Sequence, residues 1–545
     1  MAPLPYLGLG LSTNLGASDL PDPFRLIDQR PGLFDFVEYS APLSFTQAQA
    51  EAALLPELVA RRGRLPAIFH PVHLNLYGPE LESDERIAAL QDHLSQIGSP
   101  WVGNDVGWWH HGGAPFPGYL YLPPPLSEAG LSDCAAHALN LQAKLDRPLL
   151  LENPALLAKS GPLHVLDFMA ELHRRTGLGL ILDLGHLLSH QLSRGLPLKD
   201  GLDGFPLEQV IEIHLAGGVV TTRGARRFYV DDHTQAVREE LFMLLEDLLP
   251  RCVNLRAVTF EGDGHPAQVA TLTLERLRAI VPPLRESTVT MPPPKPPVPL
   301  RRETNAWSLY DAAYGERGVI EDPEGARADT DFRLAVIAER LDREFPLMRL
   351  LLAGTRAQLV SFAGSPEFRS LFDGTGRALP QVFASWARGV LRARRIPSLD
   401  GVLAFELWQQ HELSHAVPVT VTAGMISLAP GVKVGSFARD LSELLFAASG
   451  LRRHLAGRAL ASGAFEQTAI DALLQVAERA RAGSWQVALR RTSRGVDPLS
   501  VDDSLSVLLR AIGKGQPWPA FGSAPGLSRE TLDEALGEGL LTVTV

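Results

Sequence analysis

The sequence PLLLENP at residues 148–154 decides the fold that we predict for the first half of the chain. Three consecutive leucines form a short, fully apolar run, and prolines bound it on both sides. Such a run is typical of a strand buried on both faces, as in a parallel sheet covered by helices. The run ends at Glu152, and the carboxyl ends of parallel strands are where α/β enzymes place their catalytic groups.

The same pattern recurs before and after this strand, with helical stretches between most of the apolar runs. The expected strands cover residues 4–12, 34–39, 66–70, 101–105, 148–152, 177–184, 209–214 and 255–261. The expected helices cover 46–62, 84–97, 127–145, 162–176 and 234–248. Eight strands in about 280 residues match a TIM-like (β/α)8 barrel. A long aromatic and proline-rich loop runs from Trp108 to Pro125, and its part from Trp108 to Tyr121 is expected to cover the substrate.

The second half of the chain differs in composition, so we predict separate domains. Residues 1–285 form the barrel, the proline-rich stretch 286–300 is a semi-rigid linker, and residues 301–545 form a mainly helical α+β domain. Its expected helices cover 330–343, 345–354, 379–394, 399–411, 465–482 and 501–514, and an expected strand covers 417–428.

Composition limits the class of protein. The net charge of −11 and pI near 5.8 argue against a general nucleic-acid-binding protein, because phosphate binding needs an excess of Lys and Arg. No apolar run has membrane-spanning length, and the first residues lack the features of a signal peptide. With two cysteines, Cys134 and Cys252, a disulfide framework is excluded, which predicts a cytoplasmic protein.

Acids and histidines end seven of the eight expected strands or follow them closely, which predicts a metal centre at the rim of the barrel. The candidate ligands are His70, Asp105, Glu152, Asp183, His186, His214, Asp231, His233 and Glu261. This set suits two or three ions of zinc, iron or manganese, with Glu152 able to bridge two of them. Asp231 and His233 point the same way if their segment is extended.

Other polar residues near the strand ends have open roles. Glu38 is a ligand, a partner that orients a ligand, or a structural acid, and His73 and Asn153 are expected to orient ligands. His110 and His111 are expected to be loop residues. Four further histidines are expected at helix surfaces: His93, His137, His164 and His173.

Several strings resemble the DUF692 (UPF0276) family of multinuclear non-heme iron-dependent oxidative enzymes, methanobactin-biosynthesis enzymes among them. The strings are FVE at 36–38, the His70 strand, LLENP at 150–154, LD at 182–183, EIHLAG at 212–217, DDH at 231–233 and Glu261. The resemblance covers about residues 4–285 and implies a TIM-like barrel of the xylose isomerase and endonuclease IV type. Segments 399–407, 427–441 and 488–517 resemble the family's DUF2063-like partner proteins, which implies a fused peptide-capturing domain.

The resemblance implies two or three irons and O2-dependent oxidation of residues, often Cys, in a ribosomally made precursor peptide. On this basis Glu152, Asp183 and His214 are the expected catalytic residues and hold one ion with Glu261. His70 and Asp105 hold a second ion with Glu152, and His186, Asp231 and His233 hold a third.

Two departures leave the metal's identity open. Asp105 stands where the family has a histidine, and His186 stands in a string, DLGH at 183–186, that resembles endonuclease IV, a trinuclear zinc enzyme. The alternatives are therefore metal-dependent phosphodiester hydrolysis and sugar isomerisation, with zinc as the alternative metal. A further alternative is a regulatory or peptide-binding role for the second half on an inactive barrel.

Overall fold

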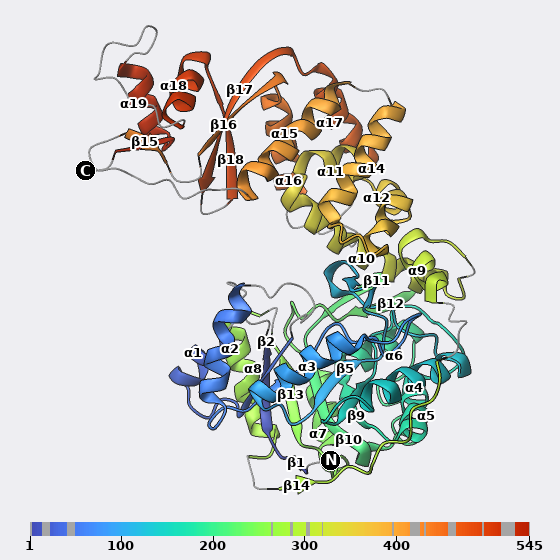
Figure 1. Cartoon of the computed structure of the whole chain (residues 1–545). Helices are drawn as coiled ribbons and strands as arrows, with labels where there is room; N and C mark the ends of the chain where they lie inside the picture. Colours follow the sequence, from blue (N-terminus) through green and yellow to red (C-terminus); the bar gives the residue numbers. More distant parts are fainter. Residues whose placement is uncertain are drawn as a thin grey trace. The chain divides into compact units, whose positions relative to one another are not determined.

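The computed structural model describes residues 3–13, 22–40, 49–262, 265–283, 287–300, 306–318, 320–394, 397–414, 426–429, 432–455, 465–492, 495–513 and 529–543. The chain divides into two compact units (Figure 1). One comprises Met1–Arg333 with Phe372–Gly376, and the other comprises Leu334–Leu371 with Arg377–Val545.

The first unit is built on a closed barrel of eight parallel strands, which confirms the predicted TIM-like fold. The barrel strands are β2 Gly8–Thr13, β3 Phe36–Tyr39, β4 Ala67–Phe69, β5 Val102–Asp105, β8 Leu149–Glu152, β9 Gly179–Asp183, β10 Val210–Ala216 and β13 Ala257–Glu261. They follow one another around the barrel in chain order, and β13 closes onto β2.

Helices surround this barrel (Figure 1). They are α1 Pro23–Gln29, α2 Gln49–Arg61, α3 Asp84–Ile97, α4 Glu128–Gln142, α5 Val165–Thr176, α6 Leu184–Arg194, α7 Glu239–Leu248 and α8 Ala267–Ile280. Helix α3 shows how local sequence sets these bounds. The Ser83 side chain accepts the Arg86 N–H at its start, and Gly98 ends it with a φ of 74°.

The barrel floor and the candidate site occupy successive layers of the same strands. Phe36, Ile68, Leu150 and Ile181 belong to one buried apolar cluster at the floor. Two residues later along the chain stand Glu38, Glu152 and Asp183 on their strands and His70 directly after β4. Because strand side chains alternate between faces, residues two apart point to the same side, here the barrel interior. The apolar floor thus supports a polar layer toward the carboxyl ends of the strands.

The proline-rich segment 287–300 makes specific contacts with the barrel. Strand β14 (Thr288–Val289) pairs with β1 (Leu4–Pro5), and Met291 is buried in the floor cluster. The Lys295 N–H donates to the Thr176 carbonyl at 2.9 Å. Residues of this segment other than proline make these contacts, so the segment is anchored in a way that composition alone did not indicate.

The first unit continues beyond this segment, whereas the sequence placed the catalytic domain's end at residue 285. Helix α9 (Ala306–Gly315) and the start of α10 (Pro323–Glu344) belong to it. Trp307 of α9 packs edge-on against Trp108, with ring centroids 5.0 Å apart. Short strands β6 (His110–His111) and β7 (Ala114–Pro115) lie in the expected loop, and a hairpin of β11 (Val219–Arg223) and β12 (Arg226–Val230) follows β10.

The second unit is mainly helical with small sheets, as predicted. Its elements include α11 Pro346–Ala353, α12 Arg356–Ala363, α13 Pro366–Arg369, α14 Leu379–Arg394, α15 Pro397–Ser414, α16 Ser442–Leu455, α17 Gln467–Arg479, α18 Asp503–Gly513 and α19 Arg529–Gly537. The strands are β15 Ile426–Leu428, β16 Lys433–Arg439, β17 Ala482–Thr492, β18 Gly495–Val501 and β19 Leu541–Val543. The central sheet β16–β17–β18 is antiparallel and was not predicted.

One expected strand, 417–428, lies outside the described residues except for its last part, which is β15. None of the described helices is long and apolar enough to cross a membrane.

Candidate metal centre

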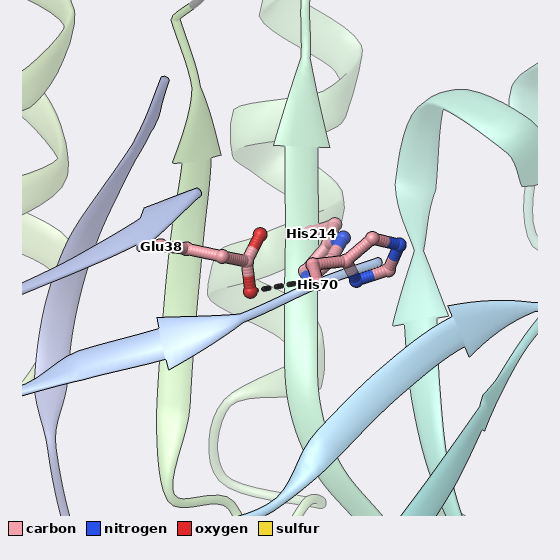
Figure 2. Close-up of side chains that lie close together, drawn as sticks. All are labelled: Glu38, His70 and His214. Atoms are coloured by element: carbon pink, nitrogen blue, oxygen red, sulfur yellow. Dashed lines mark ion pairs between the residues drawn. The ribbon is translucent and has the colours of Figure 1, made fainter. Parts of the chain in front are cut away.

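The candidate ligands converge at the carboxyl ends of the barrel strands. Among the described residues, four groups of three side chains have ligand atoms within 4.8 Å of one another. They are Glu38, His70 and His214; His70, Asp105 and Glu152; Glu152, Asp183 and His186; and Asp183, His214 and Glu261. Figure 2 shows Glu38 pointing toward the imidazoles of His70 and His214.

Glu152 lies at the centre of this cluster, and its two oxygens face different imidazoles. Its Oε2 is 3.4 Å from His70 Nε2, and its Oε1 is 3.1 Å from His214 Nδ1. Glu152 belongs to two of the four groups, one with His70 and one with His186. A carboxylate placed between several imidazoles in this way has the arrangement needed to bridge two ions.

The remaining predicted ligands extend the cluster along one side. His186 Nε2 is 3.5 Å from Asp231 Oδ2, and His233 Nε2 is 3.8 Å from Asp231 Oδ1 and 3.5 Å from Glu261 Oε2. His233 has a φ of 56°, an uncommon backbone conformation for a residue other than glycine. The segment is thus not extended as expected, yet Asp231 and His233 still approach each other.

Hydrogen bonds from neighbouring residues hold the candidate ligands Asp183 and Asp105 in position. Asn153 accepts the Asp183 N–H through Oδ1 at 2.9 Å and donates to the Asp183 carbonyl through Nδ2 at 3.0 Å. The Tyr121 hydroxyl donates to Asp105 Oδ1 at 3.0 Å, and it accepts the Ala155 N–H at 2.8 Å. Tyr121 was expected only as part of a covering loop, so its direct contact with a candidate ligand was missed.

Glu212 is another buried acid next to the site, and we did not identify it from the sequence. It stands two residues before His214 on β10, and its Oε1 is 3.6 Å from His214 Nε2. Trp101 Nε1 donates to it at 2.8 Å and the Thr259 hydroxyl at 2.7 Å. The alternation E-I-H at 212–214 is the signal that could have revealed it, since both side chains point into the barrel.

Other histidines have structural roles. His137 was expected at a helix surface but is buried, and its nitrogens lie 3.0 Å from the carbonyls of Asn75 and Gly78. His110 is buried against Glu82, with Nε2 2.8 Å from Oε1. The prediction for His137 failed because sequence alone does not show which helix face meets a loop. His73 is buried next to β4.

The burial of so many ionisable groups shifts their protonation. Burial raises the pKa of Glu152 to about 7 and that of Asp231 to about 8. Burial alone would lower the pKa of His70, but the charge of Glu152 and the hydrogen bond to Asp105 raise it to about 9. Glu152, Asp231 and His70 therefore each bind a proton more readily than they would in water.

The residues fit metal ions on two observations. Buried atoms with no hydrogen-bond partner among the described residues gather here: Glu38 Oε2, Glu152 Oε2, Asp183 Oδ2, both Asp231 oxygens, Glu261 Oε2 and both His214 nitrogens. Buried polar atoms are rarely left unpaired in proteins, and each one calls for an explanation. Metal–ligand bonds of about 2.0–2.2 Å place neighbouring ligands about 3–3.5 Å apart. The pairs around Glu152, at 3.1 and 3.4 Å, match this spacing.

The family model of the RiPP precursor modification enzymes MbnB/TglH/ChrH matches residues 8–281, which span the whole barrel. The chain belongs to this family. A UPF0276 protein of Caulobacter vibrioides (strain NA1000 / CB15N) is 31% identical over 228 residues, covering 42% of this chain and 80% of that protein. The UPF0276 protein VP3015 of Vibrio parahaemolyticus is 28% identical over 244 residues, covering 44% of this chain and 80% of that protein.

Among solved structures, endonuclease IV from Thermus thermophilus is similar with 21% identity and a TM-score of 0.32, covering 50% of this chain and 98% of that chain. Membership of the family makes this protein an enzyme that modifies ribosomally made precursor peptides.

Proposed function

We propose that this protein uses two or three iron ions and O2 to oxidise residues, in particular Cys, in a precursor peptide. The observation that carries the proposal is the set of unpaired, buried carboxylate and imidazole atoms around Glu152 in a member of a peptide-modifying family. Iron ions held there would supply the redox chemistry by which O2 accepts electrons from the peptide.

The chain's own residues have distinct roles in this proposal. Asp183, His214 and Glu261 hold one ion together with Glu152, and His70 and Asp105 hold a second with Glu152. Glu38 lies within reach of His70 and His214, so it joins the ligands rather than standing outside them.

His186, Asp231 and His233 hold the third ion. His186 Nδ1 lies 2.8 Å from the Asn153 carbonyl, which only accepts hydrogen bonds, so Nδ1 carries the proton. The lone pair of Nε2 then faces Asp231. Such a hydrogen bond to the second ring nitrogen is common for histidines that bind metals.

Metal analysis with an activity assay tests the proposal. Protein purified without oxygen should contain more than one iron per chain and should change the mass of a Cys-containing precursor peptide encoded beside its gene. Exchange of iron for zinc should abolish this activity. A zinc form that is fully active, with no iron in the purified protein, would overturn the oxidative assignment and favour phosphodiester hydrolysis.

We further propose that the second unit captures the precursor peptide. In support, it folds around its own apolar cluster, which includes Leu505, Leu509 and Leu532, and its helices and small sheets form a unit separate from the barrel. Calorimetry on the piece from about residue 301 onward, which keeps helix α10 whole, should show binding of the precursor peptide's leader without metal. Binding of the leader only to the piece that contains the barrel would remove this role.

A further inference from the structure

A pocket of about 910 Å³ in the first unit is lined by cationic side chains that the metal centre does not use. It lies among the segment before α5, the end of α6, the turn of the β11–β12 hairpin and residues 321–322. Its charged lining consists of Lys159, Arg194, Arg226, Arg227, Glu321 and Asp322. Positive charge is thus in excess here, in a chain whose net charge is −11.

Both carboxylates of the pocket are already paired. Lys159 Nζ lies 2.9 Å from Glu321 Oε1. Arg226 binds Asp322, with Nη2 2.9 Å from Oδ2, and it also donates to the Ser193 carbonyl. The cations that remain are Arg194 and Arg227, and Arg227 is exposed.

Arg194 differs from the other cationic side chains of this pocket in its hydrogen bonding. Its Nε and Nη2 atoms are buried and have no hydrogen-bond partner among the described residues. A buried hydrogen-bond donor without a partner costs free energy. The N–H donors of a guanidinium lie in one plane, and two of them can bind the two oxygens of a carboxylate or phosphate together. Burial also lowers the pKa of Arg194, and the charges of Glu321 and Asp322 offset this effect only in part.

A second pocket, of about 330 Å³, shares Lys159, Glu321 and Asp322 with the first. Its walls are mainly apolar, with Leu122, Leu156 and Leu309 among them. Ala155 is one of its lining residues. The Ala155 N–H donates a hydrogen bond to the Tyr121 hydroxyl, and that hydroxyl donates one to Asp105. The apolar pocket therefore adjoins the cationic pocket, and one of its lining residues is hydrogen-bonded to the loop next to the metal centre.

We propose that the two pockets form one binding site for an acidic segment of the peptide substrate. Apolar side chains of the peptide fill the smaller pocket, and a Glu or Asp carboxylate binds the free fork of Arg194 with support from Arg227. Charge complementarity selects this occupant, because the pocket carries more cationic than anionic side chains and so attracts a carboxylate. This inference depends on the proposed function in one respect, namely that the substrate is a peptide.

Calorimetry with defined probes tests this site on the full-length protein. The probes are an acetylated, amidated hexapeptide with two leucines followed by two glutamates, the same peptide with glutamines, and inorganic phosphate. We expect the glutamate peptide to bind at least tenfold more tightly than the glutamine peptide. Arg194→Gln should remove this difference, and Arg227→Gln should reduce it about threefold, since an exposed charge contributes less.

Arg174→Gln is the matched control, because Arg174 is an exposed arginine on α5 paired with Glu171. It should leave the affinity for the glutamate peptide unchanged. Equal binding of the two peptides, or an unchanged affinity in Arg194→Gln, would overturn the proposal. Binding of phosphate with no binding of the glutamate peptide would also overturn it, because the pocket would then hold only small anions.

These measurements need neither metal nor oxidation. Failure of the iron proposal therefore leaves their result intact, and loss of peptide binding in Arg194→Gln with full metal content would separate this site from the metal centre.

Discussion

Arg333 of α10 donates a hydrogen bond of 2.8 Å from Nη2 to the main-chain carbonyl of Tyr121. Its Nη1 donates to the Leu120 carbonyl at 2.7 Å, and its Nε donates to Asp329 at 2.8 Å. Since the Tyr121 hydroxyl donates to Asp105, this buried arginine fixes the loop that orients a candidate metal ligand. A residue 212 positions away in sequence thus supports the site.

We expect Arg333→Met to lower the free energy of unfolding by about 2 kcal/mol, because two carbonyls and Asp329 lose a charged donor. It should also lower metal content, because the Tyr121 loop loses its anchor. Arg343→Met is the control on the same helix, since Arg343 is exposed and forms an ion pair with Glu339, which is exposed as well. Urea unfolding and elemental analysis measure both effects. Equal stability and metal content in the two variants would show that the Arg333 contact positions nothing.

The sequence predicted the barrel and most of the site because both depend on short-range patterns. Apolar runs of four or five residues define the strands, and a period of two relates Leu150 on the floor to Glu152 in the site. The ends of parallel strands meet at one rim in any such barrel, so the convergence of strand-end acids and histidines follows from the fold.

The parts that the sequence did not predict depend on contacts between distant segments. The role of Arg333 arises from a side chain that binds the main-chain carbonyl of Tyr121, more than two hundred residues away in sequence. The proline-rich segment 287–300 has the composition of a free spacer, and its pairing with β1, its buried Met291 and its Lys295 N–H bond to Thr176 show that it is anchored. The hairpin β11–β12 was not recognised because its alternating pattern is interrupted by charged residues at 223–227.

Glu82 provides a prediction of pH dependence away from the metal centre. Burial alone would raise its pKa, but the hydrogen bond and charge of His110, the Asn75 N–H and Arg86 lower it to about 2 from 4.5. Glu82 therefore binds a proton less readily in the folded protein than in the unfolded chain. Its stabilising contribution is present above pH 4.5 and is lost as the pH falls toward about 2.

Accordingly, Glu82→Gln should lower the free energy of unfolding by about 2 kcal/mol at neutral pH, and the difference from the unmodified protein should shrink at about pH 3. The exposed Glu85→Gln, in the first turn of α3, is the control and should change little at either pH. Urea unfolding at the two pH values measures this. A difference that is independent of pH would show that the charge of Glu82 is not what stabilises the fold.

Glu152 and Glu212 are both buried in the barrel, but we expect their substitutions to have different effects. Glu152→Gln should remove more than one metal equivalent, because its oxygens face imidazoles on two sides. Glu212→Gln should retain the metals with about tenfold weaker affinity, because Glu212 acts through His214. Elemental analysis and chelator competition on folded protein distinguish the two. Equal metal loss in both variants would contradict the distinction.

His186→Ala should remove one metal equivalent and leave the fold intact. The Asn153 carbonyl accepts the hydrogen bond from Nδ1 of His186, so Nε2 faces Asp231 at 3.5 Å and is oriented as a ligand. The side chain contributes little to core packing, so its loss should not unfold the protein. The alternative role, orienting Asn153 by that hydrogen bond alone, would leave the metal content unchanged. His190→Ala is the control, because His190 lies one turn further along α6 and its ring packs against His164. Elemental analysis of folded protein decides between them: full metal content in His186→Ala would show that the third ion does not depend on this histidine.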